Sequence, residues 1–240
     1  MGRLRRRRAL SSMLLRQIRL WIIPVIVAGI GIFGVNLALA DTAPPPSRLE
    51  QYLQDVQLIP HSETVENYQQ VYYLFGKQKV FVTSDNMNHT NPISSGRYIV
   101  WLGSSNDVTS QVYLYDVLTN TTLQLSGLST NTYPDMDGNR VVWQQWVDNG
   151  WQVMYYDGLQ VIQISGGASS FRPRILGDTI VYVTYDANDA NHTPWHIIQY
   201  NTITGQSSLV SATDKTTQTW PHFSNKGELK SKYDLDYLSN

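Results

Sequence analysis

The side chains of this chain that best suit ligand chemistry are aromatic and acidic residues near predicted hairpin loops. Trp146 and Trp151 flank the short polar segment 147–150. Tryptophan side chains in loops can stack on sugar rings or anchor a protein partner, and carboxylates accept hydrogen bonds beside them. The alternative is that these tryptophans pack against adjacent loops. The binding residues that this pattern predicts are Trp146, Trp151 and Trp195, with Asp148, Asp186 and Asp189 as polar neighbours.

Oxygen-rich segments suggest calcium only weakly. The segment 186–191 could wrap a calcium ion through Asp186, Asn188 and Asp189, but it lacks the Gly and the bidentate Glu of an EF-hand loop. The segment 135–138 has a similar composition, but it falls in a turn that Asp and Gly favour anyway. We therefore predict no cofactor, with calcium as the weaker alternative.

Catalytic patterns are not found in the sequence. The chain has no Cys, no G-x-S-x-G elbow and no Gly-rich phosphate loop. His192 and His196 have the spacing of two metal ligands on a helix, but Pro194 lies between them in a loop-like segment. We predict no catalytic residue and no enzyme. We predict surface positions for the histidines, which are His61, His89, His192, His196 and His222.

A repeat of about 40 residues must position these side chains. One part of the unit is a Pro followed by a turn and an apolar run that ends in Trp or Tyr. Trp101 and Trp143 recur at one position of this run, which indicates packing in a core. The copies of this part are 91–101, 133–143, 172–182 and, less regular, 220–229.

The second part of the unit is a run typified by Gln111-Val112-Tyr113-Leu114-Tyr115-Asp116, followed by a turn and a third run. All of these runs are short and rich in Val, Ile, Tyr and Trp, which indicates β-strands. Four antiparallel strands per unit are typical of a propeller blade. Helical solenoids and immunoglobulin sandwiches fit this repeat less well. The copies of this second part are 70–75, 111–116, 152–157 and 196–201.

The combined pattern, P-x-x-x-G-x-x-I/V-V-W/Y followed by Q-V-Y-L-Y-D and L-x-L-S, resembles the TolB-like repeats of exported bacterial proteins. These are similar to WD-repeat blades without the Trp-Asp dipeptide. The resemblance covers about residues 64–229 and implies an all-β propeller.

The register of the repeat predicts three whole blades plus a composite or incomplete closing blade. The first unit shows the outer runs 70–75 and 79–83, and the last unit shows its Pro strand. These two parts could pair as one blade and hide the sheet edges. The alternatives are a truncated copy of a larger propeller, or a homo-oligomer in which two chains complete a ring.

The first 40 residues predict an export or anchoring segment that precedes the propeller. Seven Arg and no acidic residue lie there, and the apolar run 20–40 is long enough to form a hydrophobic helix across a membrane. Ala38-Leu39-Ala40 fits a signal-peptidase site. Cleavage after Ala40 is favoured, and an uncleaved membrane anchor is the alternative. A Pro-rich spacer and a short helix at 47–59 follow. The predicted domains are 1–40, 41–63 and 64–240.

The charge distribution excludes nucleic acid as a partner of the main domain. Seven of the 18 Lys and Arg lie in residues 1–40, so the remainder carries 11 of them against all 19 Asp and Glu. We predict a secreted or membrane-anchored, non-catalytic propeller that binds an envelope protein or glycan. One alternative is a small glycan hydrolase with acidic residues in the central channel. The other is an architectural domain that oligomerises.

Overall fold

The structure is a computed structural model that describes residues 58–105, 108–167, 169–185, 195–210 and 218–233. All of them belong to the second of two compact units, Pro45–Asn240. The predicted hydrophobic helix and most of the predicted helix at 47–59 lie outside these residues. Residues 58 and 59 are not helical.

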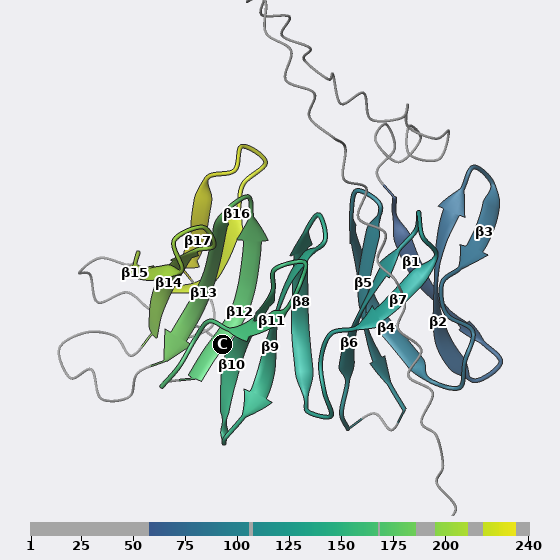
Figure 1. The fold of residues 1–240 in the computed structure, drawn as a ribbon, viewed down its shortest axis with the longest axis horizontal. Helices are drawn as coiled ribbons and strands as arrows, with labels where there is room; N and C mark the ends of the chain where they lie inside the picture. Colours follow the sequence, from purple (N-terminus) through teal and green to yellow (C-terminus); the bar gives the residue numbers. More distant parts are fainter. Residues whose placement is uncertain (1–57, 106–107, 168, 186–194, 211–217, 234–240) are drawn as a thin grey trace, which may run out of the picture. The chain divides into compact units, whose positions relative to one another are not determined.

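Five antiparallel sheets follow one another along the described chain, and each is built from strands that are consecutive in sequence (Figure 1). Sheet 1 contains β1 (Pro60–Val65), β2 (Tyr68–Phe75) and β3 (Gln78–Phe81). Sheet 2 contains β4 (Asn88–Ser95), β5 (Tyr98–Ser104), β6 (Gln111–Asp116) and β7 (Thr121–Gln124).

Sheets 3 and 4 repeat the four-stranded order of sheet 2, and sheet 5 has two strands. Sheet 3 contains β8 (Asn131–Asp137), β9 (Arg140–Val147), β10 (Gly150–Tyr156) and β11 (Val161–Gln163). Sheet 4 contains β12 (Ser169–Leu176), β13 (Thr179–Tyr185), β14 (Trp195–Asn201) and β15 (Gln206–Leu209). Sheet 5 contains β16 (Gln218–Phe223) and β17 (Leu229–Tyr233). For the described residues, the prediction of an all-β fold with four-stranded antiparallel sheets is confirmed.

The ends of the array differ from the simplest prediction. Sheet 1 has a strand, β1, that begins at Pro60 and that the repeat pattern did not predict, because its sequence PHSETV lacks an apolar alternation. In the described residues, β16 pairs with β17 and β1 pairs with β2, so sheets 1 and 5 remain separate.

Apolar side chains between neighbouring sheets form the core. Trp101 and Tyr73 belong to the cluster between sheets 1 and 2, and Trp143 and Val112 to the cluster between sheets 2 and 3. Tyr182 and Val153 belong to the cluster between sheets 3 and 4. Trp101 and Trp143 are almost fully buried, which confirms that they are core residues.

The recurring Pro marks a β-bulge in the first strand of each four-stranded sheet. The pairing register shifts across Asn91, Tyr133 and Arg172, each directly before a Pro. These three residues have φ values of 53°, 52° and 51°. A bulge bends its strand and increases the local twist. The Pro of the repeat therefore stands where no ladder hydrogen bond is required of it.

Buried polar groups of the repeat hold the strands together. The indole Nε1–H of Trp101 donates to Nδ1 of His89, and that of Trp143 donates to Oδ1 of Asn131, each at 2.9 Å. The Ser hydroxyl of the L-x-L-S run, which ends the repeat, also bonds to a neighbouring strand. Ser126 Oγ, for example, accepts the Val112 N–H at 2.8 Å. The signature residues of the repeat are therefore explained by the fold.

Candidate functional site

An aromatic pair stands at the end of the β9–β10 hairpin. Trp146 and Trp151 lie directly opposite each other on the two strands, and their rings meet edge to face with centroids 5.3 Å apart. Trp146 is 44% exposed and Trp151 is partly exposed. The prediction that these two residues flank a hairpin loop is confirmed. An exposed indole pair at a loop is a surface suited to flat ligands.

The tip of this hairpin is a tight turn made by Asp148 and Asn149. Their φ values are 47° and 66°, the left-handed conformation that a two-residue hairpin turn requires and that Asn and Asp tolerate. Gly150 begins β10, and a Cβ there would lie 3.1 Å from Ser169 Oγ. Glycine at this position thus allows the hairpin and β12 to approach closely.

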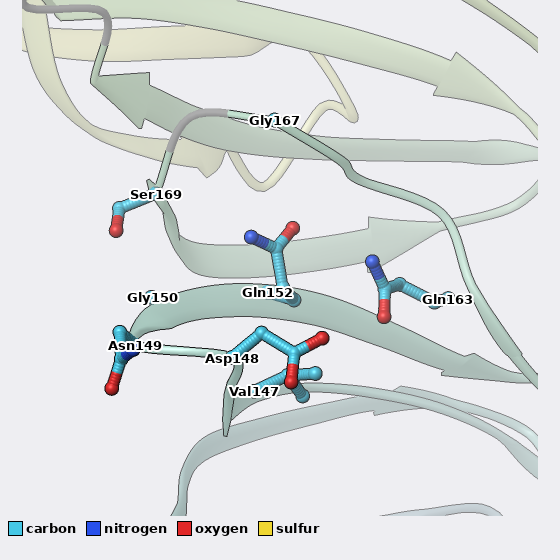
Figure 2. A pocket seen from close by; sticks show the side chains of 8 residues that line it. All are labelled: Val147, Asp148, Asn149, Gly150, Gln152, Gln163, Gly167 and Ser169. Carbon is cyan, nitrogen blue, oxygen red and sulfur yellow. The ribbon is translucent and has the colours of Figure 1, made fainter.

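A polar pocket of about 280 Å³ adjoins the tip. Figure 2 shows the side chain of Asp148 directed toward those of Gln152 and Gln163, whereas that of Asn149 points away. The lining comes from the hairpin, from β10 and β11, and from the connection to β12. The lining residues are Val147, Asp148, Asn149, Gly150, Gln152, Gln163, Gly167 and Ser169.

Ser165 fixes the two glutamines of the pocket. Its hydroxyl donates to Oε1 of Gln152 at 2.8 Å and accepts the Val153 N–H, while its carbonyl accepts from Nε2 of Gln163 at 2.8 Å. Ser169 Oγ accepts the Trp151 N–H at 3.3 Å. Since these contacts fix the polar groups before any ligand arrives, the pocket is preorganised.

The pocket and the indole pair occupy opposite faces of the same hairpin. Side chains alternate along a strand, so Trp151 lies on the face of Val153, which packs toward sheet 4. Gln152 lies on the other face, with Met154, which packs toward sheet 2. Asp148, at the tip, lies between the two faces. The alternation of side chains along β10 accounts for this split, but the approach of Gly167 and Ser169 to the pocket could not be predicted from it.

Trp195 belongs to a second aromatic group on sheet 4. Its ring lies 4.8 Å from that of Tyr185 and 5.7 Å from that of Phe171, measured between centroids. Tyr185 and Trp195 are directly opposite on β13 and β14. The structure therefore places Trp195 in a neighbouring sheet, apart from the pair at Trp146 and Trp151.

The remaining predicted site residues, Asp186, Asn188 and Asp189, lie outside the described residues. Within the part of the chain that the structure describes, no group of three or more His, Asp or Glu is arranged to hold a metal ion. The oxygens of Asp135 and Asp137 are used within the protein. They accept the N–H groups of Ile175 and Gly177 at 2.9 and 2.8 Å.

His89 contradicts the prediction of surface histidines, because it is 2% exposed. Nδ1 accepts from Trp101, so Nε2 carries the proton and donates to the Asp85 carboxylate at 2.8 Å. Both ring nitrogens thus have partners inside the protein, and the dyad is structural. The position three residues before the Pro could have revealed this, since Asn131 and Ser170, both buried, occupy it in sheets 3 and 4.

Asp135 is the acidic group that the bulged strands place at the boundary between sheets 3 and 4. Burial raises the pKa of Asp135, while the Ile175 N–H and the Arg174 guanidinium, 4.0 Å away, act in the opposite direction. Asp137 carries a second negative charge nearby and is paired with Arg140 at 2.9 Å. A raised carboxyl pKa can serve catalysis, but here it coincides with a link between two sheets.

The raised pKa of Asp135 predicts a specific pH dependence. The folded protein holds this proton more tightly than the unfolded chain, so the residue's contribution to stability is lost as pH rises through the folded-state pKa. Compared with Asp135→Asn, the native protein should therefore lose relative stability as pH rises from 4 to 8, measured by urea unfolding. Asp157→Asn is the control, since N–H groups of Gln160 and Leu159 lower the Asp157 pKa, so the difference between this variant and the native protein should stay nearly constant over the same pH range. A difference between native and Asp135→Asn that does not vary with pH would contradict the assignment.

Among the described residues, no helix is long and apolar enough to cross a membrane, and the predicted segment 20–40 is not among them.

No protein-family model matches the sequence, and no curated protein does. Similar solved structures include a TolB protein from Agrobacterium tumefaciens, with 20% identity, 65% of this chain and 62% of that chain covered, and a TM-score of 0.47. The β-propeller domain of the Trilobed protease from Pyrococcus furiosus has 13% identity, 65% and 50% coverage, and a TM-score of 0.48. This chain spans less than two thirds of either structure.

Enzymes are also among the similar structures, which contradicts the prediction that the chain is not an enzyme. Prolyl endopeptidases have 14% identity, with 68% of this chain and 26% of theirs covered and a TM-score of 0.48. An acylaminoacyl peptidase and an oligogalacturonate lyase have 14% and 11% identity. In the described residues, the consecutive four-stranded order of sheets 2, 3 and 4 is the order predicted for propeller blades.

Proposed function

We propose that this chain is an exported propeller-type protein that binds glycan at the cell envelope through the β9–β10 hairpin. The observation that carries the proposal is the exposed Trp146–Trp151 pair on a hairpin whose tip lines a preorganised polar pocket. The indole rings suit the apolar face of a sugar ring, and the Asp148 carboxylate at the tip, which lies between the two faces, can accept hydrogen bonds from its hydroxyls.

The charge of the pocket favours a neutral ligand. Its lining includes one carboxylate, Asp148, and the carboxamides of Gln152 and Gln163, and no Lys, Arg or His is among the described residues that line it. A carboxylate accepts hydrogen bonds from hydroxyls but repels a uronic acid. Neutral sugars should therefore bind better than acidic ones.

The proposed location is supported by the N-terminal sequence. The Arg cluster should remain on the cytoplasmic side, and the apolar run 20–40 should direct residues 41–240 to the outside. Envelope glycans would then be within reach of the hairpin. Sites on loops of a rigid scaffold are a common arrangement for binding.

The test is binding of the N-acetylglucosamine hexamer to the full-length protein in detergent, measured by isothermal titration calorimetry. Trp151→Ala should weaken binding about tenfold or more, since loss of an aromatic anchor removes at least about 1.4 kcal/mol. Gln69→Ala is the matched control, because Gln69 holds the corresponding position on β2 and should not affect binding. Polygalacturonate should bind more weakly than the hexamer. Lack of hexamer binding by the native protein, or an unchanged affinity in Trp151→Ala, would overturn the proposal.

A further inference from the structure

The two aromatic groups occupy the same place in adjacent sheets. Trp146 and Trp151 are a directly opposed pair on β9 and β10, and Tyr185 and Trp195 are a directly opposed pair on β13 and β14. In the repeat, Trp146 corresponds to Tyr185 and Trp151 to Trp195. The two pairs therefore recur at the same end of two neighbouring sheets, each on the face directed to the following sheet.

The fold itself does not require aromatic residues at this place. In sheet 1 the corresponding pair is Thr64 and Gln69, whose side chains hydrogen-bond to each other at 2.8 Å. In sheet 2 the repeat places Ser104 and Ser110 there. A packing requirement of the blade would apply to every sheet, as it does for the buried Trp101 and Trp143. Among sheets 1 to 4 of the described residues, the aromatic pairs occur in sheets 3 and 4 and remain partly exposed, with Trp146 44% and Tyr185 37% exposed.

The connection between the pairs runs through Ser169. Its hydroxyl accepts the Trp151 N–H, and Ser169 is itself the register partner of Tyr185. Ser169 also lines the polar pocket. Since packed sheets lie about 10 Å apart, the two aromatic pairs should be separated by about one such spacing. That distance suits a ligand of several linked units and exceeds what a single sugar ring can span.

We infer that the two pairs are stacking subsites of one elongated site, and that its ligand is a neutral, linear polysaccharide that crosses the ends of sheets 3 and 4. This inference rests on the proposed glycan-binding function. Trp146 and Trp151 form one subsite, and Tyr185 and Trp195, supported by Phe171, form the other. The Asp148 carboxylate, at the tip of the β9–β10 hairpin beside the first subsite, accepts hydrogen bonds from hydroxyls of the polysaccharide.

The test compares N-acetylglucosamine oligomers of two and six units, using calorimetry on the full-length protein. The hexamer should bind at least about tenfold more tightly than the dimer, because the second subsite adds an independent stacking contact. Trp195→Ala should remove most of this advantage and leave dimer binding within about twofold. Trp151→Ala should weaken both oligomers. Thr64→Ala in sheet 1 is the matched control and should change neither, and thermal unfolding checks that each variant is folded.

The outcomes separate the inference from the function on which it rests. Equal affinities of the native protein for dimer and hexamer would overturn the elongated site but not the first subsite. The same holds if Trp195→Ala leaves the ratio of the two affinities unchanged. Lack of binding of either oligomer by the native protein would overturn the proposed function as well.

Discussion

Replacement of Trp143 by alanine is expected to lower the free energy of unfolding by about 3–5 kcal/mol. The side chain is fully buried in the cluster between sheets 2 and 3, against Val112 and Met136. Its removal leaves a cavity and also deprives Asn131 of the indole N–H that it accepts. The measurement is urea unfolding followed by circular dichroism.

The matched control for this prediction is Trp146→Ala, three residues along the same strand. Trp146 is 44% exposed, so its removal should change stability by less than about 1 kcal/mol. If Trp143→Ala and Trp146→Ala destabilised the protein equally, the core assignment of the repeat tryptophan would be wrong. The same contrast separates the tryptophans of the fold from those that we propose for the ligand.

Replacement of Asn131 by leucine is expected to cost about 3 kcal/mol or more, although the two side chains are similar in size. Asn131 is fully buried, and its Nδ2 donates to the carbonyls of Ser110 and Ser129 at 2.6 and 2.9 Å. Its Oδ1 accepts from Trp143 at 2.9 Å. Leucine would leave these three groups without partners inside the protein, and each such group costs about 1–3 kcal/mol.

The conservative comparison for this prediction lies in sheet 2. There His89 accepts the Trp101 indole N–H just as Asn131 accepts that of Trp143. His89→Asn should therefore destabilise the protein less than His89→Leu does, in the same urea assay. If the free energy of unfolding of Asn131→Leu were within about 0.5 kcal/mol of the native value, the buried hydrogen bonds would not be needed for stability.

The sequence was sufficient to predict sheets 2, 3 and 4, because their apolar runs recur with the Pro, the turn and the terminal hydroxyl in the same order. It was insufficient for β1, whose polar sequence has no period that marks a strand. The positive φ at Tyr133 and Arg172 was also not predictable, since neither residue type favours the left-handed conformation.

The candidate site was predictable only in part. Trp146, Trp151 and Asp148 could be placed at one hairpin because a two-residue turn fixes the register of its strands. The pocket was not predictable, since Gln152, Gln163 and Ser169 come together only through the connection from sheet 3 to sheet 4. The structural use of Asp135 was likewise hidden, because it depends on contacts with Ile175 and Arg174 of sheet 4.

The most direct test of the binding site is a crystal structure of the protein with the N-acetylglucosamine hexamer. We expect sugar rings stacked on Trp151 and on Trp195, with a sugar hydroxyl donating to the Asp148 carboxylate. A hexamer bound elsewhere, such as along the bulged strands near Asp135 and Arg174, with the hairpin ends unoccupied, would contradict the account.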